Sequence, residues 1–339
     1  MAFIYETTVD PEADQNSHAF TLDIVGHNKR VLEVGCATGY FTKALRDRGC
    51  DVVGIELDAD AAAAAEKWAE RVVVGDLDAG ALWQELEGDK FDAITFGDVL
   101  EHLRDPLAAL RAAVRHLKPS GIVAISVPNI AHGDVRMALL QGEFPYHETG
   151  LLDRTHVRFF TKSGLGDMIK EAGLVLVETR RVVMPMFQTE LAVDRQDVPQ
   201  ATINSIFEDP EAETYQFVVK AVLDNGTRTL STLANRVNEL TDQAHDEVVR
   251  TALLRKEIHD HERNQEALRA AQRELDQSRR ALHESRLEAA ELRQQIDALK
   301  KENEAILNTR TFRLASPLRR LYGRIHGERK QKSALSEAM

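Results

Sequence analysis

The sequence contains few cysteines, few aromatic side chains and no long apolar run. Its two cysteines, Cys36 and Cys50, are too few for a disulfide framework, which favours a reducing cytoplasm. No apolar run reaches the roughly 18 residues that a membrane span needs, and the first residues lack an export signal. The formal net charge of −12 disfavours general binding to nucleic acid. We therefore expect a cytoplasmic protein that binds no nucleic acid.

Proline and glycine are absent from about residue 230 to residue 307, where charged residues dominate. One seven-residue grid in this segment holds Leu233, Leu240, Leu254, Leu268, Leu275, Leu282 and Ile296. The grid is interrupted at four positions, so the heptad pattern is imperfect. It predicts a long helix over 229–308, on the order of 100 Å in length, and a coiled coil that joins copies of the chain into a homo-oligomer. A single solvated helix is the alternative.

The segment 31–42, Val-Leu-Glu-Val-Gly-Cys-Ala-Thr-Gly-Tyr-Phe-Thr, has the pattern of a buried strand followed by a tight turn and a helix. The turn starts at Gly35, and Gly39 opens the helix. Glycines at these two positions allow the backbone to approach a ligand closely, because no Cβ lies in the way. Such a turn occurs in many nucleotide-binding proteins, so by itself it does not identify the ligand.

Acidic residues come at the ends of the next three predicted strands. The strand 51–56 ends in Glu56, the strand 71–76 in Asp76 and the strand 91–98 in Asp98. A carboxylate at the end of the second strand can accept hydrogen bonds from both ribose hydroxyls of an adenosine-containing ligand. Asp76 and the neighbouring Leu77 amide are placed to hold an adenine edge. The alternation of strands and helices predicts a parallel sheet, which brings these strand ends to one edge.

In order and spacing, these motifs resemble those of class I S-adenosylmethionine-dependent methyltransferases. The resemblance implies an α/β fold with a Rossmann-like seven-stranded sheet and S-adenosyl-L-methionine as the cofactor. A dinucleotide fold is disfavoured, because Gly35-Cys-Ala-Thr-Gly39 lacks the middle glycine that a pyrophosphate needs. The cofactor-binding residues that the resemblance implies are Glu33, Gly35, Cys36, Gly39, Glu56, Asp76, Leu77, Asp98 and His102.

We expect five parts in the chain. Strands at 174–183 and 214–223, the last one antiparallel, complete the predicted sheet, and 184–213 is long enough to hold a helix that covers the active face. The predicted helices cover 59–70, 79–86, a segment from Pro106 to about Pro119, and 161–172. The parts are an arm (1–17), a methyltransferase domain (18–226) with a lid insertion (129–160), a long helix (229–308) and a basic amphipathic tail (309–339).

The lid carries the predicted catalytic residues. An alcohol acceptor must lose its proton during methyl transfer, and a placed base accelerates such a step by about 10²–10⁴-fold. We expect His156 to be that base, with Asp153 orienting its imidazole and Arg154 holding polar groups of the acceptor. No metal is expected, since no tight ligand spacing is present. The alternative is a magnesium ion bound by His102, His132, Asp153 and His156.

The lid phrase from Gly142 to Phe160 also resembles methyltransferases found among bacterial glycan-assembly enzymes. This resemblance predicts an O-methyltransferase that acts on a sugar of a bacterial polysaccharide or of a glycolipid precursor. One alternative is a small-molecule O-methyltransferase of the quinone-biosynthesis type. Another is a coiled-coil scaffold that carries a methyltransferase-like head.

The tail has an apolar stripe at helical spacing, surrounded by arginines. Its apolar members are Leu318, Leu321, Tyr322 and Ile325. A basic amphipathic helix over 310–330 would contact the inner face of the cell membrane or a partner such as a glycosyltransferase. A disordered end is the alternative.

Overall fold

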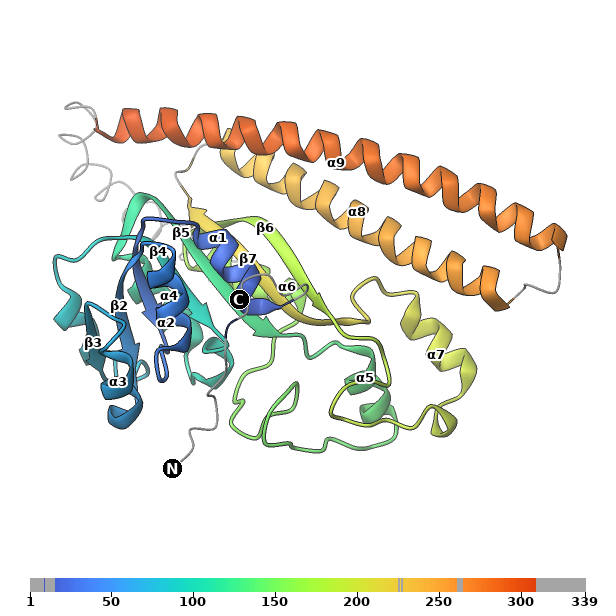
Figure 1. Ribbon diagram of the computed structural model, residues 1–339, viewed down its shortest axis with the longest axis horizontal. Coiled ribbons are helices and arrows are strands. Elements are labelled where there is room, and N and C mark those ends of the chain that lie inside the picture. Colours follow the sequence, from blue (N-terminus) through green and yellow to red (C-terminus); the bar gives the residue numbers. More distant parts are fainter. Residues whose placement is uncertain (1–8, 10–15, 225, 227, 261–264, 309–339) are drawn as a thin grey trace, which may run out of the picture. The chain divides into compact units, whose positions relative to one another are not determined.

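The computed structural model describes residues 9, 16–224, 226, 228–260 and 265–308 (Figure 1). The chain forms two compact units, Met1–Arg293 and Gln294–Met339, and the first of them contains the whole sheet. The predicted basic tail (309–339) and most of the predicted arm (1–17) lie outside the described residues. The predictions made for them are therefore still predictions.

A seven-stranded sheet forms the centre of the first unit, as predicted. Its strands lie in the order β3-β2-β1-β4-β5-β7-β6. The first five strands are parallel, and β7 is antiparallel to both of its neighbours, which confirms the expected antiparallel last strand. The order reverses between β1 and β4, where ligands of such sheets bind outside the carboxyl ends of the strands. The strands are β1 (Arg30–Val34), β2 (Asp51–Glu56), β3 (Arg71–Val74), β4 (Phe91–Gly97), β5 (Leu117–Pro128), β6 (Leu174–Val183) and β7 (Thr214–Leu223).

Helices cover both faces of the sheet because successive strand residues point to opposite sides. In β1, Val31 packs with α1 (Ser17–Val25) and α2 (Tyr40–Asp47) on one face. The next residue, Leu32, packs with α4 (Pro106–Val114) and α6 (Lys162–Glu171) on the other face. A further helix, α3 (Ala59–Ala65), packs against β2 and β3. This layering leaves the carboxyl ends of the strands as the place for a site.

Three helix boundaries differ from those predicted. Helix α3 ends at Ala65 rather than near residue 70, and the segment after β3 is a 3-10 helix, η1 (Ala81–Leu86). Pro119-Ser-Gly121 lies inside β5 instead of ending the preceding helix. The register of the β4–β5 pair shifts between Phe91 and Ala93, and proline and glycine are tolerated at such an irregularity.

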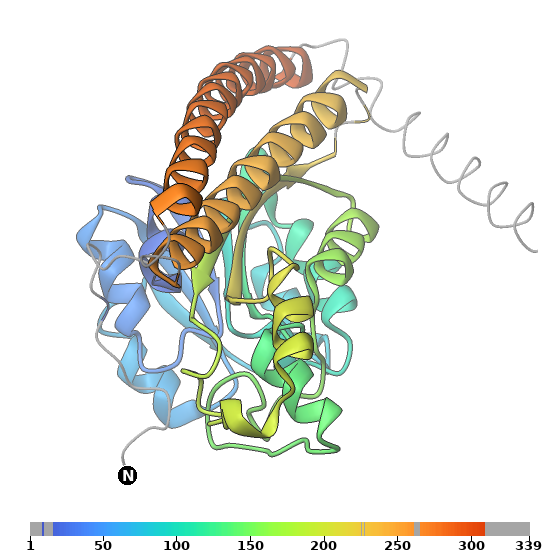
Figure 2. The same ribbon diagram turned by 90° about the vertical axis from the view of Figure 1, so that its right-hand side faces the viewer.

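The lid insertion (129–160) contains a helix that the sequence did not predict, α5 (Gly133–Leu140). The predicted helix in the connection 184–213 is present as α7 (Gln200–Phe207), after the short 3-10 helix η3 (Arg195–Asp197). In Figure 1 and Figure 2, α5 and α7 lie side by side. Met137 of α5 belongs to one buried cluster with Ile203 and Ile206 of α7. The connection therefore packs on the lid.

Two helices follow the sheet, α8 (Arg228–Asp260) and α9 (Gln265–Asn308), so the predicted long C-terminal helix is present but in two pieces. A single continuous helix over 229–308 is wrong, because Arg236 Nη2 lies 3.4 Å from Glu288 Oε1. In one straight helix those residues would be about 78 Å apart. Homo-oligomerisation through this segment is still a prediction. None of the helices in the described ranges combines the length and apolar character that crossing a membrane would require.

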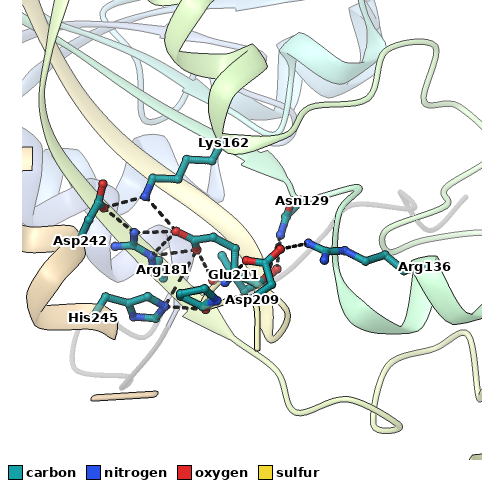
Figure 3. Close-up of polar contacts among 10 residues, drawn as sticks. Asn129, Arg136, Lys162, Arg181, Asp209, Glu211, Asp242 and His245 are labelled. Carbon is teal, nitrogen blue, oxygen red and sulfur yellow. Dashed lines mark hydrogen bonds and ion pairs between the residues drawn. The ribbon is translucent and has the colours of Figure 1, made fainter. Parts of the chain in front are cut away.

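Helix α8 packs against the edge strand β6, where Asn238 Nδ2 donates to Leu176 O at 2.7 Å. An ionic cluster reinforces this contact (Figure 3). Arg181 of β6 lies 2.7 Å from both Glu211 Oε1 and Asp242 Oδ1, and Asp242 belongs to α8. Lys162 pairs with the same two carboxylates at 3.0 and 2.7 Å. The helix therefore covers an edge strand that would otherwise be open to pairing.

Candidate active site

Both predicted loop glycines adopt the left-handed backbone conformation, with φ of 74° at Gly35 and 84° at Gly39. A Cβ on Gly35 would lie 2.5 Å from Val99 Cγ2, and one on Gly39 would lie 2.8 Å from Ala65 Cα. Neither position therefore accepts a side chain without displacing its surroundings. The glycines shape the turn that opens α2 beside the end of β1.

The carboxylate of Glu56 fixes this turn to the end of β2. Its Oε2 accepts a hydrogen bond from Ala37 N at 2.8 Å, and its Oε1 accepts from Leu57 N and Asp58 N at 2.8 and 2.9 Å. The side chain stays half-exposed, so further donors such as ribose hydroxyls can reach it. Ala37 itself has a φ of 46°, which brings its amide towards Glu56.

Apolar side chains are exposed beside Glu56 on the two neighbouring strand ends. Leu57 is 69% exposed and Val74 is 48% exposed, although most large apolar residues of the sheet are buried. Val74 pairs with Glu56 across the β2–β3 ladder. Asp76 is exposed and accepts from Asp78 N at 2.8 Å, whereas the side chain of Leu77 packs against the main core. This edge offers apolar contacts and a carboxylate to a flat heterocycle.

Two predicted cofactor ligands, Glu33 and Cys36, place their side chains behind the loop instead of facing a ligand. Glu33 is 4% exposed, and its Oε2 accepts from Thr42 Oγ1 at 2.6 Å. Burial raises the pKa of Glu33 to about 8. Burial likewise raises the pKa of the Cys36 thiol, whose sulfur fills the space beside Gly54. Both side chains therefore support the turn from inside, and the prediction that these residues bind the cofactor is left to their backbone groups.

Asp98, at the end of β4, is held in a strained conformation with a φ of 53°. Its Oδ1 accepts from Ser126 Oγ at 2.9 Å and from Gln216 Nε2 at 3.0 Å, which ties it to β5 and β7. Strained residues of this kind concentrate at functional sites. His18 lies in the same region; burial lowers its pKa, and the charge of Asp98 partly opposes this effect. Neither Ser126 nor Gln216 belongs to a recognisable sequence motif.

The backbone at the end of β4 is open to a ligand, as binding of the cofactor that the resemblance implies would require. Gly97, at the end of β4, is exposed, and nothing lies within 4 Å of the position where its Cβ would be. This opening is at the switch point between β1 and β4, beside the loop of Gly35. The half-exposed Glu56 and the apolar side chains of Leu57 and Val74 complete a set of groups that fits an adenosyl ligand.

A second cluster joins the end of β4 to the lid. Glu101, His102 and His156 each offer a side-chain ligand atom, and these atoms lie within 4.8 Å of one another. Glu101 is 1% exposed, and neither of its carboxylate oxygens has a hydrogen-bond partner within the described part of the chain. Burial, and then the charge of Asp98, raise the pKa of Glu101 well above its usual range. The backbone oxygen of Glu101 accepts from Val157 N at 2.9 Å, which joins the lid to this strand end.

The imidazole of His156 is oriented by a backbone carbonyl, because Nδ1 lies 3.3 Å from Leu151 O. The expectation that Asp153 orients this ring stays a prediction. Asp153 Oδ1 accepts from Thr155 N at 2.7 Å and from Thr155 Oγ1 at 2.6 Å. Thr155 Oγ1 in turn lies 3.0 Å from His102 Nδ1. Burial and the charge of His102 lower the pKa of His156, which favours its neutral form.

Two other predicted residues lie outside this cluster. Arg154 is 57% exposed and pairs with Glu148 at 2.7 Å, so the structure gives no support for its predicted catalytic role. His132 is fully buried, with Nε2 2.9 Å from Met184 O, and its Nδ1 accepts from Asp134 N at 3.2 Å. Both ring nitrogens of His132 are thus engaged. The predicted alternative, a magnesium site that includes His132, is wrong.

Comparison with known proteins gives a consistent result. The model of a family described as a methyltransferase domain matches residues 10–179. A ubiquinone biosynthesis O-methyltransferase from Hydrogenovibrio crunogenus is 29% identical over 175 residues, which cover 50% of this chain and 73% of the relative. The corresponding protein of Psychrobacter arcticus is 33% identical over 165 residues, or 46% of this chain and 63% of the relative. The Pseudomonas aeruginosa protein of the same name is 35% identical over 153 residues, which cover 43% of this chain and 64% of the relative. The chain thus spans less than two thirds of the length of the last two.

Among solved structures, a SAM-dependent methyltransferase from Archaeoglobus fulgidus has a TM-score of 0.46 and 18% identity, covering 62% of this chain and 94% of its own. A 1,6-didemethyltoxoflavin-N1-methyltransferase from Burkholderia thailandensis has a TM-score of 0.40 and 20% identity, covering 62% and 77%. The family match includes the loop of Gly35 and the strand ends with Glu56, Asp76 and Asp98. The chain therefore belongs to the methyltransferase-domain family and is an S-adenosylmethionine-dependent methyltransferase.

Proposed function

We propose that the chain transfers the methyl group of S-adenosylmethionine to a hydroxyl oxygen of an acceptor held beneath the lid. The cofactor supplies the methyl group and the positive charge, and the protein aligns the reactants and excludes water. The observation that carries the proposal is the cluster of Glu101, His102 and His156 beside the end of β4. A hydroxyl acceptor must lose a proton, and this cluster is where the chain can assist that loss.

A hydroxyl on an aromatic ring is the acceptor that the observations favour. Aromatic side chains of the lid lie next to His156: Phe159 is 6.4 Å from it between ring centroids, and Phe144 lies 5.8 Å from Phe159 and 5.4 Å from Tyr146. Tyr146 is 56% exposed and Phe159 is 39% exposed, so both present ring surface to a ligand. The relatives named for O-methylation in ubiquinone biosynthesis also support this choice.

The second candidate is the sugar acceptor predicted from the lid phrase between Gly142 and Phe160. Sugars also stack on exposed aromatic rings, so the same lid surface accommodates either class. Its basis is the resemblance of the lid sequence alone, and the comparisons add nothing to it. The predicted membrane or glycosyltransferase contact of the tail belongs to this second proposal.

A panel of methyl acceptors separates the two candidates. The wild-type chain and His156→Ala are assayed for label transfer from methyl-labelled S-adenosylmethionine to catechols, hydroxylated quinol precursors and nucleotide sugars. We expect transfer to catechols, with kcat falling by about 10²–10⁴-fold in His156→Ala and affinity for S-adenosylhomocysteine unchanged. His116→Ala is the matched control, because His116 stacks on Trp83 at the opposite edge of the sheet. Transfer to sugars alone would reject the aromatic acceptor, and full activity of His156→Ala would remove the cluster from the reaction.

A further inference from the structure

The carboxylate of Glu101 stands out among the buried acids because neither of its oxygens is hydrogen-bonded to any of the described residues. The side chain is 1% exposed, so water does not replace the hydrogen bonds that its oxygens lack within the described part of the chain. Burying a carboxylate in this way is costly unless it is hydrogen-bonded, paired or bound to a cation. His102 and His156 lie beside it, each with a ligand atom within 4.8 Å of a Glu101 oxygen. An unpartnered acid with two imidazoles beside it has the composition of an open metal site.

We propose that Glu101, His102 and His156 bind a divalent transition-metal ion of the zinc type, which holds and activates the acceptor hydroxyl. The catalytic part of this assignment rests on the proposed O-methylation, whereas the binding of the ion does not. The donors come from two separate segments, the short 3-10 helix η2 (Leu100–His102) after β4 and the lid. The ion would therefore connect the lid to the sheet.

The donor set indicates the class of ion. Two imidazole nitrogens and one carboxylate oxygen suit zinc and neighbouring transition metals, whereas magnesium and calcium prefer oxygen ligands throughout. Three protein ligands leave a fourth position open, as in catalytic zinc sites. Ligand atoms around a tetrahedral zinc ion lie about 3.4 Å apart, so the present limit of 4.8 Å requires a small inward movement of the three side chains.

The groups behind the two histidines fit this role. A metal-bound imidazole usually donates its second ring N–H to a carbonyl or a carboxylate, which fixes the ring. His156 Nδ1 faces Leu151 O at 3.3 Å, which leaves Nε2 with the lone pair. His102 Nδ1 faces Thr155 Oγ1 at 3.0 Å, and that hydroxyl donates to Asp153 Oδ1 at 2.6 Å. Asp153 and Thr155 thus act as positioning residues for His102.

The ion would change the role of His156 from free base to ligand. A hydroxyl oxygen bound at the open position has a lowered pKa, so that its proton leaves to water near neutral pH. The oxygen then forms a bond to the methyl carbon, the carbon–sulfur bond breaks, and its electron pair neutralises the sulfonium charge. The products are the methyl ether, S-adenosylhomocysteine and one proton, so no oxidant or reductant is needed.

Zinc binding tests the assignment directly. Untagged full-length protein is stripped with a chelator and titrated with zinc in competition with a chromophoric chelator. We expect one zinc ion per chain, with affinity lowered by at least about a hundredfold in Glu101→Gln and in His156→Ala. His116→Ala is the matched control and keeps the wild-type affinity, because this histidine lies away from the cluster. Equal zinc affinity in wild type and Glu101→Gln would overturn the site, as would no binding by the wild type.

Cobalt substitution covers the case in which a variant does not fold. Cobalt added to the stripped wild-type chain should give visible absorption bands of a four-coordinate ion without thiolate ligands, and the absence of bands would overturn the site. Calorimetry with S-adenosylhomocysteine on the same samples shows whether the fold is intact. Methyl transfer that persists unchanged after chelation would overturn the catalytic part. A zinc-loaded chain that methylates no hydroxyl would instead refute the proposed function and leave the metal site standing.

Discussion

Glu101 and Glu211 are two buried carboxylates with opposite surroundings. Glu211 lies in the cluster of Figure 3, where Arg181 contacts it at 2.7 Å, Lys162 at 3.0 Å and the Thr214 hydroxyl at 2.7 Å. Burial raises the pKa of Glu211, but the hydrogen bonds and charge of Arg181 outweigh burial and lower it to about 2. No hydrogen-bond partner reaches the oxygens of Glu101 from the residues that the structure describes, and its burial raises its pKa well above the usual range. We infer that Glu211, which is paired, stabilises the fold, whereas the oxygens of Glu101 are available to bind a ligand.

Arg181→Met should have the largest effect on the difference between Glu211 and Glu101. It removes one of the cations that pair with the buried Glu211 carboxylate. Removing one partner of a buried ion pair costs about 3–5 kcal/mol, and we expect the free energy of unfolding to fall by about 4 kcal/mol. Urea denaturation measures the change. Arg154→Met is the matched control, since its pair with Glu148 is exposed and should contribute less than about 1 kcal/mol. Equal losses in the two variants would show that burial does not distinguish these pairs.

Glu211→Gln should cost about 3 kcal/mol at pH 7, and the cost should depend on pH. The pKa of Glu211 in the folded chain, about 2, is below the unfolded value of about 4.5. The contribution of Glu211 to the free energy of unfolding is therefore fully present above about pH 4.5, and it is lost as the pH falls towards 2. Unfolding of wild type and variant, followed by circular dichroism, should give curves that converge between pH 5 and pH 2. A difference that stays constant over this range would contradict the pairing.

Glu33→Gln tests a buried acid whose pKa is shifted in the opposite direction from that of Glu211. Burial raises the pKa of Glu33 in the folded chain to about 8. Because this pKa is raised in the folded chain, the contribution of Glu33 to the free energy of unfolding is fully present below about pH 4.5. This contribution is lost as the pH rises through 8. Between pH 6 and pH 7.5 the wild type should lose about 2 kcal/mol relative to Glu33→Gln. Thermal unfolding at several pH values measures this difference. Parallel profiles of the two proteins would mean that Glu33 is ionised in the fold.

The sequence allowed the cofactor edge to be predicted because its signals are local. An apolar run, a glycine turn and an acid at the strand end occupy neighbouring positions at Gly35 and again at Glu56. The parallel sheet then brings those ends together, as found.

The lid could not be predicted in the same way, because its contacts join distant residues. The ring of His156 faces the backbone oxygen of Leu151. A backbone acceptor cannot be identified from the types and spacing of side chains. Glu101 is joined to the lid through its backbone oxygen, which accepts hydrogen bonds from Val157 N and Arg158 N, more than 50 residues along the chain. The separation of α8 from α9 was missed because leucines of the heptad pattern stand on both sides of it, at Leu254 and Leu268, and the interruption at His261 is one of four in the segment. The spacing of apolar residues does not show where a helix ends when no glycine or proline marks the end.

The central claim is that the ends of β1, β2, β3 and β4 bind the adenosyl cofactor through Glu56. Calorimetric titration with S-adenosylhomocysteine tests it most directly, with circular dichroism confirming that each variant is folded. We predict one site per chain in the wild type and affinity weakened by about a hundredfold or more in Glu56→Ala, because two charge-assisted hydrogen bonds are lost. Glu70→Ala, which removes an acid paired with Arg30 at the opposite edge, should bind like the wild type. Equal affinity in wild type and Glu56→Ala would contradict the account.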